Sequence, residues 1–121
     1  MKTWLTGAFG ELACAKHLRE HGYEILSCNY KSRFGEIDLI AGNRKIIAFV
    51  EVKTRKNDSF ATALENVTLK KRAKIIKTAS SYLVKSKDTR QPRFDVCEVY
   101  YDQIDGLPQL VRLNYIENAF C

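Results

Sequence analysis

Alternation of apolar and polar positions in the first half of the chain predicts one helix followed by three strands. Residues 2–21 have apolar side chains at helical spacing and stop at Gly22, a residue that readily ends a helix. Residues 23–31 have the composition of a short strand. The runs 35–41 and 45–55 flank a Gly-Asn-Arg turn, which is typical of a β-hairpin.

The second half of the chain predicts a second helix and two more strands. Thr68 is a suitable N-cap for a helix that continues to about Lys85. Around this helix we expect a loop at 56–66, strands at 92–101 and 108–115 with a turn at Asp105-Gly106, and a helical turn in the tail at 116–120. The order α-β-β-β-α-β-β predicts an α/β fold, a mixed β-sheet flanked by helices, forming a single domain over residues 1–121.

Three polar residues interrupt the most hydrophobic part of the chain. The run 46–52 resembles a strand buried on both faces, yet Glu51 and Lys53 break it, and Asp38 breaks the run before it. Because alternate residues of a strand share a face, Phe49, Glu51 and Lys53 point the same way. A buried carboxylate without a partner is costly, so such groups usually pair or bind metal.

The first helix adds another acid to this set. At helical spacing Glu11 lies among Trp4, Ala8, Ala15 and Leu18, within the stripe expected to face the core. Hard oxygen ligands of this kind suit Mg²⁺, which takes one or two carboxylates together with waters and substrate phosphates.

Structural roles for these residues are the main alternative. Glu51 and Lys53 are also compatible with an ion pair on an edge strand, and Asp38 with a surface pair to Arg33 or Arg55. A purely structural buried network of the acids and Lys53 is a further reading. The combination of the apolar run into Glu-Val-Lys, the preceding Gly-Glu-Ile-Asp-Leu and an inward Glu11 favours a functional site.

Charge is the feature of the composition that bears on partners. The 121 residues carry a net charge of +6 and have a pI of about 9.2, which favours a polyanionic partner. In the second helix we expect a buried stripe of Leu69, Ala73, Ile76 and Leu83 and a separate lysine face of Lys70, Lys74 and Lys77. That face suits phosphate contacts, or is simply solvated.

Two other groups of residues have competing interpretations. Tyr30 and Phe34 lie beside basic residues before the hairpin, where they suit either stacking on unpaired bases or packing in the core. Cys14, His17 and His21 share one helix face, but no nearby fourth ligand completes a zinc site.

Cysteine usage and hydropathy indicate the compartment. The four cysteines are scattered without a CxxC pair, which favours reduced thiols in a cytoplasmic protein. Glu11 and a broken apolar run argue against a signal peptide, and no stretch has the length of a membrane span. We therefore expect a cytoplasmic protein with no membrane partner.

The stretches GEIDLI and FVEVKTR resemble the PD-(D/E)xK nuclease signature, with Asp38 as the first acid and Glu51-Val52-Lys53 as the E-x-K. Together with Glu11 they are similar to the archaeal Holliday junction resolvases. Nearly the whole chain, from GAFGELACAKHLREHGYEILSCNYKSRFGEIDLI through ENVTLKKRAKI to the terminal ENAF, resembles the YraN family of small uncharacterised bacterial proteins.

This resemblance implies a restriction-endonuclease-like fold and assigns roles to individual residues. Glu11, Asp38 and Glu51 would be metal ligands for Mg²⁺ or Mn²⁺, and Asp38, Glu51 and Lys53 the catalytic residues. Ile37 stands where the signature has proline. Lys71 would contact phosphate, and with it we group the other basic candidates for nucleic-acid contact, Arg55, Lys70, Lys74 and Lys77.

The function expected is that of a metal-dependent endonuclease acting on nucleic acid, with DNA favoured over RNA and branched or structured DNA included. A junction-cutting enzyme would need two active sites and hence a homodimer. The alternative is a non-catalytic nucleic-acid-binding or adaptor protein that keeps the nuclease fold. Against that alternative, all four polar positions of the site are intact.

Overall fold

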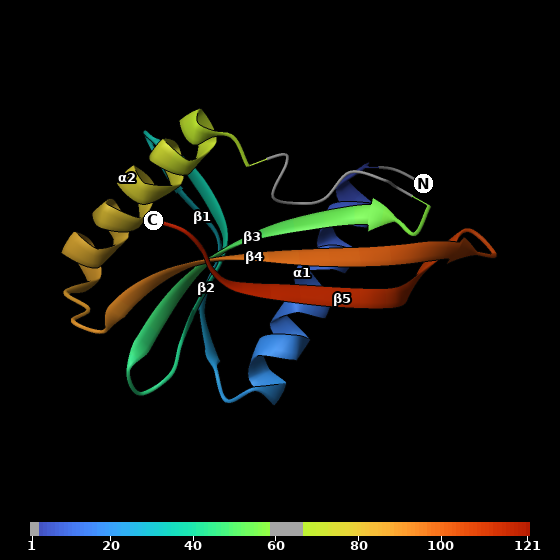
Figure 1. Ribbon diagram of the computed structural model, residues 1–121, viewed down its shortest axis with the longest axis horizontal. Coiled ribbons are helices and arrows are strands. Elements are labelled where there is room, and N and C mark those ends of the chain that lie inside the picture. Colours follow the sequence, from blue (N-terminus) through green and yellow to red (C-terminus); the bar gives the residue numbers. More distant parts are fainter. Residues whose placement is uncertain (1–2, 59–66) are drawn as a thin grey trace.

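The computed structural model describes residues 3–58 and 67–121, with side chains from residue 5 onward, and it contains the expected order of elements (Figure 1). The elements are α1 (Thr3–Glu20), β1 (Glu24–Ser32), β2 (Gly35–Gly42), β3 (Ile46–Lys56), α2 (Leu69–Ser86), β4 (Gln91–Ile104) and β5 (Leu107–Phe120). Most of the loop predicted at 56–66 lies outside the described residues.

The five strands form one mixed sheet in the order β1-β2-β3-β4-β5. Neighbouring strands are antiparallel except β3 and β4, which are parallel. The crossover connection between these two strands contains α2. The predicted mixed sheet flanked by helices is therefore confirmed. Because β3 is the central strand, the reading of Glu51 and Lys53 as an edge-strand pair is wrong.

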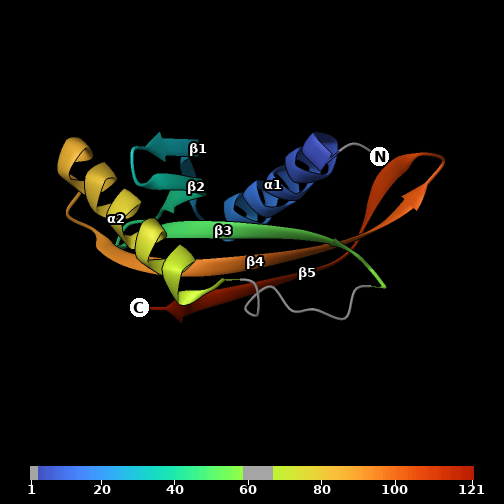
Figure 2. The same ribbon diagram turned by 90° about the horizontal axis from the view of Figure 1, so that it is seen from above.

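The two helices cover opposite faces of the sheet (Figure 2). Phe49 belongs to the core cluster beneath α2, and Ala48 and Val50 belong to the cluster beneath α1. The expected alternation along β3 is therefore present, and burial of both faces explains why this strand reads as a continuous apolar run.

Helix α1 packs closely on the sheet through a small residue. Gly10 is buried, and a Cβ atom added to it would overlap the side chain of Thr54 on β3. Ala15 and Leu18 are buried as predicted, but Ala8 is exposed and Glu11 is only half-buried. Glu11 therefore lies at the margin of the buried stripe, and the predicted position of Trp4 concerns a side chain outside the described ones.

The buried face of α2 differs from the predicted stripe. Leu69 is 81% exposed and Ala73 is exposed, whereas Ile75, Thr78 and Ala79 are buried. Leu69 lies in the first turn of the helix and points away from the core, although Val67, two residues earlier, is buried in it. Thr78 enters the core because its hydroxyl donates to the carbonyl oxygen of Lys74 within the same helix, at 2.8 Å.

The helical turn predicted at 116–120 is wrong, because these residues continue β5. Phe120 pairs with Phe94 on β4 and is buried against its ring, with centroids 5.4 Å apart. The intervening Asn118 adopts a left-handed φ of 52° and its backbone N–H donates to Asp95 Oδ1 at 2.9 Å. This bulge interrupts the strand alternation, which is why the segment does not read as a strand in the sequence.

Candidate functional site

The backbone pairing of β2 and β3 ends where the predicted polar residues begin. The antiparallel ladder extends to Leu39 and Val50. Continuing the same register by one residue would place Asp38 opposite Glu51. The Val52 backbone N–H donates a hydrogen bond of 2.7 Å to Asp38 Oδ2, which takes the place of a backbone carbonyl of β2. The ladder is thus closed by a side chain, which leaves two carboxylates near the end of the paired region.

The carboxylate of Glu51 is held by lysines from two elements. Lys53 Nζ lies 3.4 Å from Glu51 Oε1, and Lys71 Nζ lies 2.9 Å from the same atom. Glu51 itself is 9% exposed, so its charge needs compensation by nearby cations. The sequence predicted Lys53 beside Glu51, and the fold adds Lys71.

Asp38 is in an environment that disfavours its charge. Burial raises the pKa of Asp38 to about 7, and the negative charge of Glu51 adds to this effect. The hydrogen bond from Val52 acts in the opposite direction, and the charges of Glu11 and Glu36 raise the pKa further. Asp38 is therefore a carboxyl group that would be stabilised in its charged form by a bound cation.

The two lysines differ in their response to this environment. Burial, followed by the neighbouring Lys71, lowers the pKa of Lys53 despite the attraction of Glu51. For Lys71 burial also acts to lower the pKa, but the hydrogen bonds to Lys53 and Glu51 outweigh it, so the pKa is raised. Of the two lysines, Lys53 is therefore the one that gives up its proton more readily.

Glu11 stands near the site but has a different partner. Its Oε1 accepts a hydrogen bond of 3.0 Å from Asn29 Nδ2, which joins α1 to β1. Asn29 has a left-handed φ of 53°, a conformation that asparagine tolerates better than most residues. No sequence pattern singled out Asn29.

The predicted three-acid ligand set is therefore not assembled as a compact group. Within residues 3–58 and 67–121, no three His, Cys, Asp or Glu side chains are placed so that together they could hold a metal ion. The pair Asp38 and Glu51 nonetheless has the donor chemistry of a magnesium site, since one or two carboxylates suffice when phosphate and water complete the coordination. The ammonium group of Lys71 already places one cation against this pair.

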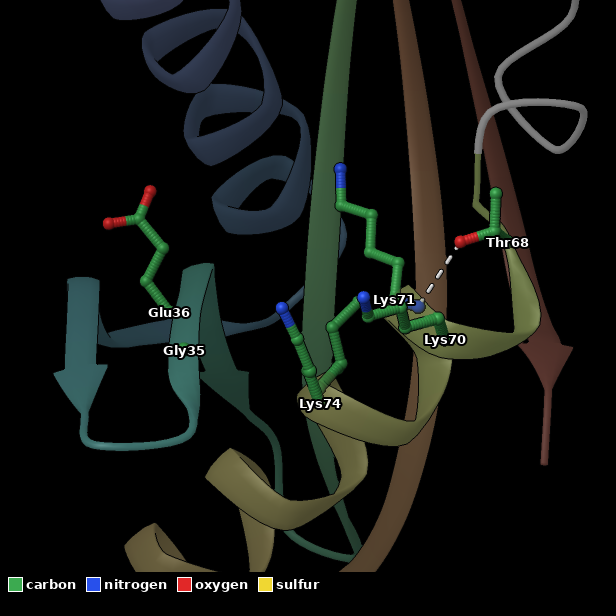
Figure 3. Close-up of a pocket in the computed structure, with 7 residues that line it drawn as sticks. Gly35, Glu36, Thr68, Lys70, Lys71 and Lys74 are labelled. Atoms are coloured by element: carbon green, nitrogen blue, oxygen red, sulfur yellow. Dashed lines mark hydrogen bonds between the residues drawn. The ribbon is translucent and has the colours of Figure 1, made fainter.

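A cavity of about 430 Å³, the lysine hollow, opens between α2 and β2 next to these residues. Figure 3 shows the lysines of α2 on one side of it and Glu36 of β2 on the other, with Lys71 reaching toward β3. Thr68 caps the helix here, because its hydroxyl accepts from the Lys71 backbone N–H at 3.2 Å. Lys70, Lys71 and Lys74 line the hollow, so its wall is suited to an anion.

Comparison with known proteins identifies the family. The profile of the uncharacterised protein family UPF0102 matches residues 10–99, which include Asp38, Glu51, Lys53 and Lys71. The chain belongs to UPF0102. UPF0102 is the YraN family, so the resemblance read from the sequence is confirmed.

UPF0102 relatives match over nearly their whole length. A UPF0102 protein of Caldicellulosiruptor bescii is 44% identical over 116 residues, covering 94% of this chain and 95% of its own. A UPF0102 protein of Clostridioides difficile is 44% identical over 115 residues, with coverage of 94% and 95%. A UPF0102 protein of Persephonella marina is 38% identical over 116 residues, with coverage of 95% and 100%.

The remaining basic candidates of this UPF0102 chain lie on β3 and α2. Arg55 follows Lys53 on the same face of β3, and its Nε is buried with no hydrogen-bond partner in the described structure. Lys70 and Lys74 line the lysine hollow, whereas Lys77 lies further along α2.

The zinc site weighed from the sequence finds little support in this geometry. Cys14 is buried beside Cys97, while the ring of His17 stacks between His21 and Tyr115. These contacts give the three residues packing roles in place of a zinc site. Among the described helices, none has the length and hydropathy required to cross a membrane.

Proposed function

We propose that this protein is a divalent-metal-dependent nuclease that hydrolyses phosphodiester bonds in nucleic acid, with DNA favoured as the substrate. The observation that carries the proposal is the juxtaposition of Asp38 and Glu51 at the end of the β2–β3 ladder, beside Lys53. The resemblance to the PD-(D/E)xK signature supports the same assignment. Glu11 would assist through its charge near Asp38.

Asp38 and Glu51 would hold Mg²⁺ or Mn²⁺, which when bound lowers the pKa of water and neutralises charge on the phosphate. Lys53 would orient the attacking water or stabilise the negative charge that develops on the phosphoryl oxygens. As the water oxygen bonds to phosphorus and gives up a proton, the bond from phosphorus to the departing oxygen breaks and that oxygen takes up a proton. The lowered pKa of Lys53 makes it a suitable participant in proton transfer.

Lys71 would exchange partners when substrate binds. It pairs with Glu51 at 2.9 Å and also borders the lysine hollow. With a cation held by Asp38 and Glu51, the Lys71 ammonium group would be free to contact a substrate phosphate together with Lys70 and Lys74. Arg55, with its buried and unpartnered Nε within the described structure, offers a further phosphate contact.

One observation favours the second candidate, a non-catalytic nucleic-acid-binding protein that keeps this fold. The Lys71–Glu51 ion pair gives Glu51 a protein partner without any metal. Under this reading the acids and Lys53 are structural, and the lysine hollow alone contacts phosphate.

Cleavage and metal binding together separate these functions. A labelled panel of duplex, single-stranded, flapped and four-way-junction DNA and structured RNA is incubated with Mg²⁺, Mn²⁺ or EDTA. We expect metal-dependent cutting that falls by about 10²-fold or more in Lys53→Ala and is lost in Asp38→Asn. Lys56→Ala, an exposed position on the same strand, is the matched control.

Metal binding is followed independently by calorimetry with Mn²⁺, which wild type is expected to bind and Asp38→Asn is not. Salt-sensitive binding of nucleic acid without cutting, unchanged in both variants, would establish the second candidate instead. Preferred cutting of the four-way junction would require two copies of the chain, which analytical ultracentrifugation with the junction would detect.

A further inference from the structure

A second hollow lies on α2 beyond the lysine hollow, next to the turn between β1 and β2. This Phe34 hollow has a volume of about 460 Å³. Phe34, Ile76 and Val84 give it an apolar lining, to which Lys77 and Lys85 add positive charge. No acidic side chain is among the lining residues that the structure describes. An aromatic, apolar cavity whose charged lining residues are both lysines is suited to a ligand with a flat uncharged part and attached negative charge.

The aromatic ring is positioned by the fold. The Phe34 backbone N–H donates to Ser32 Oγ at 3.1 Å, and that hydroxyl donates to Thr78 Oγ1 at 3.4 Å. Thr78 is fully buried in α2, so these bonds attach the turn to the helix. Phe34 itself is only half-buried, which leaves part of the ring accessible in an anchored turn.

Cations surround the ring. The guanidinium carbon of Arg33 lies 4.9 Å from the centroid of Phe34, and Lys77 Nζ lies 6.0 Å from it. An aromatic ring flanked by cations is the arrangement that proteins use to stack a nucleobase and contact its phosphate.

The Phe34 hollow continues the path from the candidate site. Lys71, Lys74 and Lys77 recur at three-residue spacing along one side of α2, and Gly35 of the lysine hollow directly follows Phe34 in the chain. From Lys71 to Lys77 the helix rises by about 9 Å. That distance corresponds to roughly two or three nucleotides of a stacked strand at about 3.4 Å each.

We propose that the Phe34 hollow is a binding site for an unpaired nucleobase, located two or three nucleotides from the phosphate held at Asp38 and Glu51. In a duplex each base is covered by its neighbours, so only an unpaired base can offer its face to Phe34. The inference rests on the proposed nuclease function for the position of the phosphate. It narrows the substrate to nucleic acid with a single-stranded segment next to the cut.

Binding is measured by fluorescence anisotropy in EDTA, so that no cleavage intervenes, with a labelled single-stranded oligonucleotide and a fully paired duplex. Phe34→Ala is expected to weaken binding of the single strand by about five-fold or more, the loss of one stacked base, and to leave duplex binding unchanged. Phe34→Trp should restore it. Leu107→Ala removes a 63% exposed side chain on the β4–β5 turn and is the matched control, expected to match wild type.

A spectroscopic readout tests stacking directly. The chain has one tryptophan, so Phe34→Trp in a Trp4→Phe background gives a single reporter in the hollow. Its emission should be quenched by the single strand and not by the duplex. Circular dichroism and thermal melting of every variant verify that the fold is retained.

Several outcomes would overturn the base site: unchanged affinity in Phe34→Ala, equal losses for single strand and duplex, absence of quenching, or no binding of either oligonucleotide. These outcomes are independent of the nuclease test. If the protein binds single strands through Phe34 but cuts nothing, the base site stands without the nuclease. If Asp38→Asn abolishes cutting while Phe34→Ala binds as wild type, the nuclease stands without the base site.

Discussion

The carboxylate of Asp38 takes the place of a backbone acceptor for Val52. Asp38 Oδ2 accepts the Val52 N–H at 2.7 Å directly after the β2–β3 ladder ends at Leu39 and Val50. One side chain therefore closes the ladder and stands beside Glu51. This dual position gives Asp38 both a structural and a chemical role, and the two can be separated by substitution.

Asp38→Asn keeps an acceptor for Val52 and removes the charge. The folded-state pKa of Asp38 is about 7, above the unfolded value of about 3.9, so the folded protein retains a proton in this interval. The stability contributed by this protonation is present at low pH and declines as the pH rises from about 4 to 7. The variant should thus be more stable than wild type at pH 8, by on the order of 1–3 kcal/mol. Its free energy of unfolding should also change less with pH.

Urea denaturation at pH 5 and pH 8 measures this difference. Asp102→Asn alters an exposed acid near the β4–β5 turn and should leave the profile unchanged. A profile of Asp38→Asn that parallels wild type would show that Asp38 is charged throughout. Mg²⁺ should stabilise wild type at pH 8 and not the variant, because the cation favours the ionised carboxyl.

Lys71→Met should raise the affinity for Mn²⁺. The ammonium group of Lys71 lies 2.9 Å from Glu51 Oε1 and competes with a divalent cation for that carboxylate. Since Lys71 is partly exposed, its removal is expected to tighten Mn²⁺ binding by at most about five-fold, equivalent to about 1 kcal/mol of ion pairing. Calorimetric titration measures the Mn²⁺ affinity, and Lys70→Met, at an exposed position of the same helix, is the control. Weaker Mn²⁺ binding in Lys71→Met alone would contradict the competition.

Gly10→Ala should destabilise the protein because α1 approaches β3 at this point. The added Cβ would overlap the side chain of Thr54 and lie 3.0 Å from the Thr54 Cβ, so the helix must shift. We expect a loss of about 1–3 kcal/mol, as for other overpacked interiors. The same substitution at Gly7 meets no atom within 4 Å and should be neutral or stabilise by up to about 1 kcal/mol through helix propensity. Thermal denaturation of the two variants compares them, and equal effects would show that the close approach is unimportant.

A buried ionic group on the α1 side of β4 offers a fourth test. Asp95 is fully buried, pairs with Arg93 at 2.8 Å and accepts a 2.6 Å hydrogen bond from the Tyr115 hydroxyl. Asp95→Ala removes the buried carboxylate that pairs with Arg93 and should lower the free energy of unfolding by about 3–5 kcal/mol. Tyr115→Phe should lower it by about 1–3 kcal/mol. Glu117, 3.8 Å from Arg93 and 63% exposed, should tolerate alanine.

Denaturant titration of these three variants gives the comparison. An Asp95→Ala protein as stable as Glu117→Ala would mean that the burial of this group adds nothing to the fold. Sequence reading did not identify Asp95, because a single acid in an apolar strand gives no indication of which side chains will surround it.

Local patterns were sufficient for several parts of the molecule. Gly22 ends α1 with a positive φ of 86°, and Thr68 caps α2 through its hydroxyl. The Asp105-Gly106 turn is also present, with positive φ at both residues. Each of these features depends on the conformational preference of one or two residues, so the sequence contains the whole cause.

Such local patterns did not predict the strand at residues 116–120 or the buried face of α2. Residues 116–120 are a strand because Phe120 stacks on Phe94 and Asn118 bonds to Asp95, contacts made across more than twenty positions of the chain. Thr78 is buried and Leu69 exposed because of where the helix lies on the sheet. Helical periodicity alone does not fix that placement.

The sequence by itself determined the order of the elements, the family and the presence of Asp38, Glu51 and Lys53 in a central apolar hairpin, because short-range patterning encodes each of these. Tertiary structure alone decided that the ladder stops before Asp38 meets Glu51, that Glu11 turns to Asn29, and that Lys71 reaches Glu51. These arrangements arise where α1, α2 and two strands converge. Their burial and charge depend on all four elements together, so no local stretch of sequence contains them.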